Sequence, residues 1–322
     1  MLTLQKFIEK INSRAKFDGL VRFGESMALH TTFKTGGPAD LWIQPGDCFP
    51  AYVPFLLKEA RAGEIPVFVL GGGSNLVVSD RGIRGITLDT GGWKGHEVKI
   101  PDAGRRGSRG PETARVEFRS GTPADQAAET AAALGLSGLE FLAGMPGTAG
   151  GAVWMNARCY GHEAAGVLAE TLVLDENFEY VKIPGNVTGF SYKKSPFQRT
   201  KAVIVSVTFD LVSRPVREIR EEMEDHRRDR KAKGHYRYPS AGSAFKNNRA
   251  FGKPAGKLID ELGLRGLSSG GARVAPFHGN IIINTGNASS ADIRNLAVLV
   301  ADRVRAETGL ELEPEILFAG EW

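Results

Sequence analysis

The sequence predicts a fold of mixed helices and strands that binds a cofactor at glycine-rich turns. Helix and strand patterns alternate along the 322 residues, and two glycine clusters each adjoin an apolar run. The clusters are residues 71–75, Gly-Gly-Gly-Ser-Asn, and residues 144–152. Glycine lets backbone N–H groups approach a phosphate closely and adopts positive φ. The spacing matches neither the dinucleotide motif G-x-G-x-x-G nor a P-loop, so it indicates a cofactor but not the usual nicotinamide-binding fold.

Composition is typical of a globular protein that acts on a small molecule. The net charge of +4 is too small to argue for nucleic-acid binding, but it is compatible with an anionic substrate. Cys48 and Cys159 lie far apart without metal-ligand spacing, so we expect a reducing cytoplasm, no disulfide framework and no metal. There is no run of roughly 18 apolar residues, so no membrane partner is expected.

The N-terminal part predicts alternating helices and strands. Residues 1–10 are typical of a short amphipathic helix rather than a signal peptide. The helix expected at 55–62 is closed by Gly63, and the strand expected at 66–70 ends at the first glycine cluster, where α/β proteins commonly place ligands. Further strands are expected at 39–43 and 85–89.

The middle part predicts strands around a polar stretch, followed by a helix. Residues 102–112 hold three arginines and no interleaved aromatics, which favours a hairpin loop over a basic nucleic-acid patch. The flanking strands are expected at 98–100 and 114–118. An Ala-rich helix at 123–134 is expected to open at Thr122, and strands follow at 171–174 and 202–209.

The C-terminal part begins with a charged helix at 216–233, which we interpret as a solvated element bridging domains. The remaining expected elements are a helix at 256–262, a strand at 281–284, a helix at 292–308 and a strand at 312–318.

Ser243 is the first candidate for chemistry, in the segment Pro239-Ser-Ala-Gly-Ser-Ala-Phe-Lys-Asn. A serine between glycine and alanine is usually structural, and the absence of G-x-S-x-G argues against a hydrolase. Lys246 and Asn247 offer a cation and an amide to an anionic ligand. Glu313 and Glu315 would share one face of the last strand, and a carboxylate there matters only if it meets Ser243 in space.

The segment Tyr192-Lys193-Lys194-Ser195 is a cationic and aromatic turn between Phe190 and Phe197. It is open to two interpretations, a surface turn or a site for a carboxylate. His278 is interpreted as a hydrogen-bonded residue at a strand end. Gly36-Gly37 alone would indicate a turn, but together with the other two clusters it favours a cofactor contact.

Seven segments in order resemble the UDP-N-acetylenolpyruvoylglucosamine reductase family. They begin at Thr32, Gly72, Gly138, Tyr192, Ala241, His278 and Leu312, and they span nearly the whole chain. The resemblance implies an α+β fold class, with an FAD-binding region of the vanillyl-alcohol-oxidase type built from two subdomains and a C-terminal α/β domain for a UDP-sugar. The implied ranges are 1–90 joined by 306–322, then 91–213, then 214–305.

The resemblance implies a cytoplasmic monomer in which NADPH reduces non-covalent FAD. Flavin N5 then delivers hydride to the β-carbon of UDP-N-acetylglucosamine enolpyruvate, giving UDP-N-acetylmuramate for peptidoglycan. It makes Ser243 the donor of a proton to the α-carbon and Glu315, rather than Glu313, the supporting carboxylate. The implied cofactor contacts are Thr35, Gly36, Gly37, Gly71, Gly72, Gly73, Ser74, Asn75, Gly144, Pro146, Gly147, Gly150, Gly151 and Asn156, and the implied substrate contacts are Tyr192, Lys246 and Asn247.

The sequence departs from the family pattern at two positions. Lys193 stands where the family has a catalytic arginine and lacks the bidentate fork of a guanidinium, with Lys194 as a second candidate. Arg158 stands where a small residue is usual, and it would contact a phosphate or lie in solvent. Only 50 residues separate Lys193 from Ser243, which matches the shorter subclass. Alternative functions are a flavin oxidase of the same fold acting on a sugar or lactone, and a non-catalytic flavin- or UDP-sugar-binding protein.

Overall fold

The computed structural model describes residues 2–99 and 113–322. The stretch 102–112, which the sequence predicts to be a hairpin loop, lies outside the described residues. The strands before and after it, β6 (His96–Lys99) and β7 (Thr113–Arg119), pair antiparallel, with Val98 opposite Val116.

The chain divides into two compact units, and the division falls within strands β1, β2 and β5 and within helix α5. The three domain ranges implied by the family resemblance stay a prediction. The first unit comprises Met1–Val21, Ile43–Gly72 and Leu88–Arg228, and the second comprises Arg22–Trp42, Gly73–Thr87 and Asp229–Trp322.

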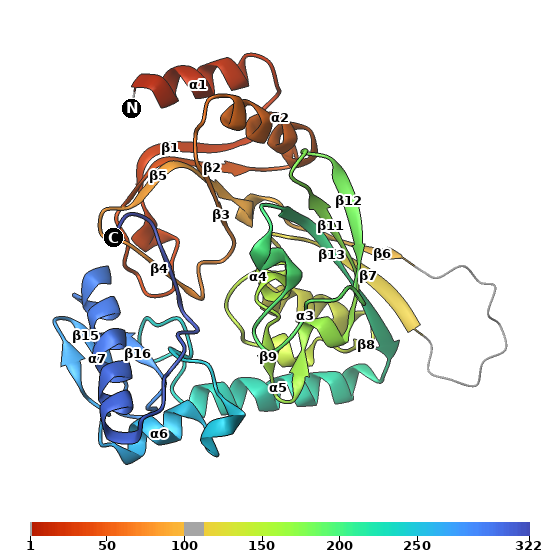
Figure 1. The fold of residues 1–322 in the computed structure, drawn as a ribbon. Helices are drawn as coiled ribbons and strands as arrows, with labels where there is room; N and C mark the ends of the chain where they lie inside the picture. Colours follow the sequence, from red (N-terminus) through yellow and green to blue (C-terminus); the bar gives the residue numbers. More distant parts are fainter. Residues whose placement is uncertain (1, 100–112) are drawn as a thin grey trace. The chain divides into compact units, whose positions relative to one another are not determined.

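The main sheet of the first unit is six-stranded, in the order β12-β11-β13-β7-β6, with β8 beside β13 (Figure 1). Its central strand β13 contains the apolar run predicted at 202–209, and the residues from Val203 to Phe209 are all buried. Pairing with β7 is antiparallel, with Phe209 opposite Val116. The remaining bounds are β8 Leu136–Ser137, β11 Leu168–Leu174, β12 Tyr180–Pro184 and β13 Val203–Ser213; a separate hairpin pairs β9 Arg158–Cys159 with β10 His162–Glu163.

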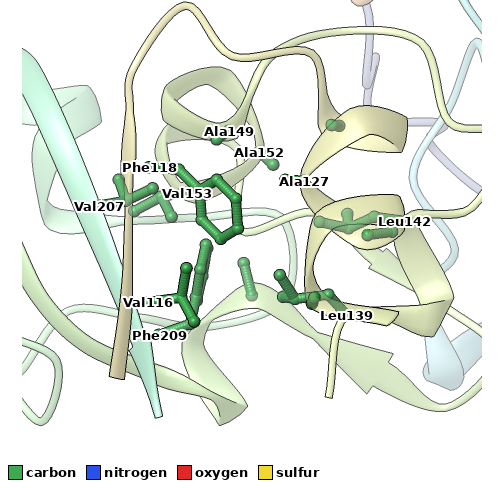
Figure 2. Close-up of a cluster of buried hydrophobic side chains, with 14 of the residues drawn as sticks. Val116, Phe118, Ala127, Leu139, Leu142, Ala149, Ala152, Val153, Val207 and Phe209 are labelled. Atoms are coloured by element: carbon green, nitrogen blue, oxygen red, sulfur yellow. The ribbon is translucent and has the colours of Figure 1, made fainter. Parts of the chain in front are cut away.

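Helices α3 (Ala124–Ala133) and α4 (Ala149–Trp154) contribute to the core at this sheet (Figure 2). The rings of Phe118 and Phe209 lie 6.2 Å apart at 50°, and Val153 of α4 is buried in the same cluster. Small alanine side chains on one face of α3 complete this core. Burial of each phenylalanine contributes about 1.5–3 kcal/mol.

Two predicted helix starts are wrong for identifiable reasons. Helix α3 has Pro123 at its N-cap, and the hydroxyl of Thr122 instead donates a 2.9 Å hydrogen bond to the carbonyl of Gly95. Helix α2 (Phe49–Ala62) begins before the predicted Phe55 and contains Pro54. A proline inside a helix leaves the carbonyl four residues earlier without its N–H partner. Here the Tyr180 hydroxyl donates to that carbonyl, on Pro50, at 2.6 Å.

The remaining sheet of the N-terminal region has the order β1-β2-β5-β3, and it confirms the strands expected at 39–43, 66–70 and 85–89. A further strand, β4, pairs in parallel with β17 near the C-terminus, with Leu76 opposite Leu317. The helix expected at the N-terminus is α1 (Leu2–Asn12). The strand bounds are β1 Gly19–Ser26, β2 Pro38–Pro45, β3 Val67–Leu70, β4 Leu76–Val78, β5 Ile83–Asp89 and β17 Leu317–Ala319.

The second unit packs helices α6 (Ala255–Glu261) and α7 (Ser290–Thr308) with a three-stranded sheet, β14-β15-β16. Helix α7 begins with a capping box between Ser289 and Asp292 and ends at Gly309, whose φ is 71°. Its buried residues recur at helical spacing, which turns one face toward the core. The strand bounds are β14 Ser268–Ser269, β15 Ala272–Val274 and β16 Ile282–Asn284.

The last predicted strand, 312–318, is regular only at Leu317–Ala319. Pro314 lacks the N–H that a ladder needs, so the residues before Leu317 pair irregularly with the backbone near Ala244. Helix α5 (Val216–Ala232) matches the predicted charged helix, with Ile219 and Met223 buried and exposed ion pairs such as Arg217 with Glu221 at 2.7 Å.

Candidate active site

The loop that carries Ser243 lies beside the segment that carries Glu315, within the second unit. The N–H of Glu315 donates a 2.8 Å hydrogen bond to the carbonyl of Ala244, and Phe245 forms a bridge with Pro314. Ser243 itself forms a bridge with Ile281. The Ser243 side chain is half-buried and Glu315 is 7% exposed. The structure therefore brings together the two segments that carry the predicted acid and its supporting carboxylate.

Glu313 lies in a different environment from Glu315, so the prediction that they share one strand face is wrong. Glu313 is exposed, and its carboxylate accepts a 2.6 Å hydrogen bond from Lys246 Nζ. The segment is not a regular strand at this point, because Pro314 separates the two glutamates. Lys246, predicted to contact the substrate, thus has its ammonium paired with Glu313.

Asn247, the other predicted substrate contact of this loop, supports the start of helix α6. Its Oδ1 accepts a 2.9 Å hydrogen bond from the N–H of Ala255, the first residue of that helix.

In the second unit, the end of the first glycine cluster contacts both the N-terminal region and the Glu315 segment. Gly73 has a φ of 57°, and a Cβ there would lie 2.0 Å from the carbonyl oxygen of His30. Asn75 Nδ2 donates a 2.9 Å hydrogen bond to the carbonyl of Glu315. Ser74 lies half-buried between them. A predicted cofactor turn is therefore hydrogen-bonded to the segment of the predicted catalytic carboxylate.

The segment Thr35-Gly36-Gly37, also in the second unit, packs against the turn after strand β4. The N–H of Gly37 donates to the carbonyl of Ser79 at 2.9 Å, and a Cβ on Gly37 would lie 2.1 Å from the carbonyl oxygen of Asp80. Gly36 has a φ of 133°, which excludes most side chains.

In the first unit the two glycine clusters touch each other. A Cβ on Gly72 would lie 2.5 Å from Gly147 Cα, and one on Gly71 would lie 3.1 Å from Thr148 Oγ1. Any side chain at Gly72 would push the segments apart, so glycine is required there for close approach.

The glycines at and before helix α4 serve the protein's own packing. The N–H of Gly150 donates to the Ser120 carbonyl at 3.0 Å, and the N–H of Gly151 donates to Thr148 Oγ1 at 3.2 Å. The N–H of Gly144 donates to Asp125 Oδ1 at 2.7 Å. Pro146 is exposed between these anchored residues.

Tyr192 and Lys193 form the tip of a tight turn in the first unit. Ser191 and Lys194 exchange backbone hydrogen bonds of 3.1 and 3.0 Å. Lys193 has a φ of 57°, a left-handed conformation that costs a non-glycine residue about 1–2 kcal/mol. The guanidinium of Arg158, whose role the sequence left open, lies 5.8 Å from the centre of the Tyr192 ring. It also lies 3.8 Å from a carboxylate oxygen of Glu163.

Asn156, predicted to contact the cofactor, uses both ends of its side chain within the first unit. Its Nδ2 donates to the carbonyl of Ser191 at 2.9 Å, and its Oδ1 accepts from the N–H of Ala165 at 3.0 Å. The residue is fully buried. Ser243 and Glu315 belong to the second unit and Lys193 belongs to the first. The surroundings of Lys193 are therefore described separately from those of Ser243 and Glu315.

His278 is hydrogen-bonded as predicted, since its Nδ1 accepts from the N–H of Asn280 at 3.1 Å, but it lies in the turn between strands β15 and β16 rather than at a strand end. Burial lowers the pKa of His278. The His235 ring lies 6.3 Å away, and burial, with the positive charge of Arg230 next in importance, lowers the pKa of His235 to about 4. Both imidazoles are therefore neutral at pH 7.

Three residues of the site region were not singled out from the sequence. Thr148 accepts from the N–H of Gly151 as the N-cap of α4, and a threonine directly before a helix is a recognisable signal. Ser195 and Gln198 both donate to the carbonyl of Trp154, at 2.6 and 3.0 Å. Ser195 lies in the turn segment noted from the sequence but was given no role there, and no sequence signal marks Gln198, because its acceptors are backbone groups.

Five buried hydroxyls among the described residues lack a hydrogen-bond partner, some in the first unit and some in the second. Thr35 Oγ1 and Ser120 Oγ are two of them. A buried hydroxyl without a partner costs about 1–3 kcal/mol, which a bound polar group would offset. Over residues 2–99 and 113–322 we find no group of three or more His, Cys, Asp or Glu side chains placed to hold a metal ion. No helix in the same ranges has both the length and the apolar character needed to cross a membrane.

The chain is similar to proteins of one family along most of its length. A model of an FAD binding domain matches residues 51–176, and a model of the UDP-N-acetylenolpyruvoylglucosamine reductase C-terminal domain matches residues 234–319. The chain is 38% identical to UDP-N-acetylenolpyruvoylglucosamine reductase of Treponema denticola over 95% of each chain. It is 37% identical to that of Borreliella burgdorferi over 99% of this chain and 98% of the relative.

A solved structure agrees with these sequence relatives. The crystal structure of UDP-N-acetylenolpyruvylglucosamine reductase from Thermus caldophilus superposes with a TM-score of 0.70 at 32% identity. The match covers 94% of this chain and 99% of that one.

Proposed function

Because the chain belongs to the UDP-N-acetylenolpyruvoylglucosamine reductase family, we propose that it reduces UDP-N-acetylglucosamine enolpyruvate to UDP-N-acetylmuramate with electrons from NADPH. The family resemblance and the α+β FAD-binding fold class are confirmed, and the chain is an oxidoreductase of this family. The observation that carries the proposal is the 38% identity over 95% of both chains. A role in peptidoglycan precursor synthesis and a cytoplasmic, monomeric state belong to the same proposal.

The residues of the glycine clusters are proposed to hold FAD without a covalent bond. The contacts come from residues 35–37, 71–75 and 144–151, and their support is the FAD binding domain model that matches residues 51–176 and the unpartnered Thr35 hydroxyl. Bound FAD supplies the hydride, taken from NADPH, that adds to the β-carbon of the enolpyruvyl group. The Asn156 side chain is left out of this set because both of its polar ends bond the protein.

The catalytic side chains are proposed to stabilise the negative charge that forms on the substrate and to deliver a proton to it. Hydride addition to the β-carbon places negative charge on the α-carbon and the carboxylate. The ammonium of Lys193 stabilises that charge, and Tyr192, Lys246 and Asn247 help to bind the substrate. The Ser243 hydroxyl donates its proton to the α-carbon, which completes the saturated ether. Glu315, buried beside the Ser243 loop, supports the serine in this transfer.

The visible spectrum of the purified protein tests the function. Without oxygen, NADPH should bleach the flavin absorbance, and UDP-N-acetylglucosamine enolpyruvate should restore it. Bleaching by a sugar with no response to NADPH would instead indicate an oxidase. A flavin that responds to none of these compounds would indicate a binding protein.

A further inference from the structure

The Tyr192-Lys193 turn is fastened to the C-terminal end of helix α4 by side chains that the proposed mechanism does not use. Asn156 Nδ2 donates to the carbonyl of Ser191 at 2.9 Å. Gln198 Nε2 donates to the carbonyl of Lys193 at 3.3 Å and to that of Trp154 at 3.0 Å, and Ser195 Oγ donates to Trp154 as well. The turn therefore has anchors on both sides of its tip.

The turn needs this fastening because its tip is strained. Lys193 has a φ of 57°, and a non-glycine residue stays in that region only when its surroundings determine its conformation. Ser191 is exposed, whereas its partner Asn156 is fully buried, so the rigid side of the bond is Asn156.

Asn156 is itself held firmly. Its φ of 44° is one that asparagine tolerates better than most residues, and its N–H donates to the Val153 carbonyl at 3.0 Å. Its Oδ1 accepts from Ala165. The helix that ends here, α4, begins at the second glycine cluster. The side chain of Asn156 therefore links the end of helix α4 to the turn that carries Lys193.

We propose that Asn156 is a positioning residue that sets Lys193 in place for the substrate carboxylate, with Gln198 in support. The inference rests on the proposed function only for the role of Lys193. The anchoring itself is a property of the first unit.

Asn156→Asp in the holoenzyme tests the proposal. Aspartate keeps the side-chain size and can still accept from Ala165, but its carboxylate cannot donate to Ser191. Asn186→Asp is the matched control, because it makes the same charge change at an exposed residue of the same unit. If Asn156→Asp does not fold, Gln198→Met carries the test by removing the bond to Lys193 with little change of shape.

Two readouts are measured. Trypsin cleavage after Lys193 and Lys194, followed by mass spectrometry, should be several-fold faster in Asn156→Asp than in Asn186→Asp. In stopped-flow, Asn156→Asp should slow reoxidation of the reduced flavin by the enol ether roughly 10- to 100-fold, since small misplacements cost this much. The rate of flavin reduction by NADPH should stay within about twofold, because Lys193 takes no part in that half-reaction.

A double-mutant cycle separates positioning from a general structural effect. In a Lys193→Met background, Asn156→Asp should have no further effect on reoxidation. An undiminished effect in that background, or loss of both half-reactions together, would overturn the proposal, as would wild-type behaviour in both readouts. If the wild-type flavin is not reoxidised by the enol ether, the proposed function fails, while the trypsin comparison still decides whether Asn156 holds the turn.

Discussion

The backbone N–H of Glu315 donates a 2.8 Å hydrogen bond to the carbonyl of Ala244, the residue that follows Ser243. The carbonyl of Glu315 in turn accepts from Asn75 Nδ2 at 2.9 Å. Both backbone groups of this glutamate are therefore held, one by the serine loop and one by the glycine turn. The main chain on both sides of this buried carboxylate is therefore fixed in place.

Ser243→Ala should separate the two half-reactions. Without its hydroxyl, proton delivery to the α-carbon is lost, so reoxidation of reduced flavin by the enol ether should slow by about 10²- to 10⁴-fold. Flavin reduction by NADPH should be unchanged in stopped-flow absorbance. Ser240→Ala, in the same loop, is the control that should leave both rates intact. Equal loss of both half-reactions in Ser243→Ala would contradict its role as proton donor.

Gly72→Ala should weaken FAD binding and lower stability together. The new methyl group would lie 2.5 Å from Gly147 Cα and force the two glycine clusters apart. Such overpacking costs about 1–3 kcal/mol, which corresponds to a Kd for FAD weaker by roughly 5- to 150-fold if the whole cost falls on the FAD-bound form. Flavin-fluorescence titration and Tm report the two effects. Gly166→Ala is the matched control, because nothing lies within 4 Å of its Cβ. Tight FAD binding by Gly72→Ala would show that the clusters can separate without harm.

The free energy of unfolding should fall with acidification in the range where His235 titrates. Burial lowers the folded-state pKa of His235 to about 4, against about 6.5 in the unfolded chain. Between these two values only the unfolded chain takes up the proton, so stability decreases as the pH falls from 6.5 to 4 and this contribution is constant outside that window.

His235→Gln should reduce this pH dependence, because glutamine does not titrate. Urea unfolding at pH 7.5, 6 and 5 measures it, and a smaller slope should remain because burial also lowers the pKa of His278. Parallel curves for the wild type and the variant would show that His235 is accessible to protons in the folded protein.

Phe118→Ala should destabilise the first unit by about 3–5 kcal/mol, because it removes a fully buried ring from the core between the sheet and α4. Chemical unfolding followed by tryptophan fluorescence measures the change. Leu134→Ala, at a half-exposed position of the same unit, should change stability by no more than about 0.5 kcal/mol. Similar effects of the two substitutions would mean that the cluster in Figure 2 does not dominate stability.

Elements with a local signal could be predicted from the sequence, and those that depend on distant partners could not. The apolar run of β13 and the amphipathic pattern of residues 292–308 are local signals, and both elements are present, although helix α7 begins at Ser290. Helix α2 is predicted to begin at Phe55 but begins at Phe49, because a proline such as Pro54 usually breaks a helix. Pro54 leaves the carbonyl of Pro50 without a helical partner, and the hydroxyl of Tyr180 donates to that carbonyl instead. Tyr180 lies 130 positions further along the chain, so the sequence near Pro54 gives no sign of this bond.

The same distinction holds at the site. The residue patterns indicate Ser243, Glu313 and Glu315 as candidates for chemistry. Only the family motif favours Glu315 over Glu313. The structure adds a physical difference, since Glu313 is exposed and paired with Lys246 whereas Glu315 is buried. Gln198 could not be found, because a side chain that donates to carbonyls leaves no pattern in the sequence.

Helix α4 has a consequence for how this protein can change over time. Its six residues, about 9 Å long, include the last residues of the second glycine cluster and lead to Asn156, which is hydrogen-bonded to the lysine turn. Inserting or deleting one residue would rotate one end against the other by about 100°. A change in the length of the helix would therefore put the second glycine cluster and Lys193 out of register in one step.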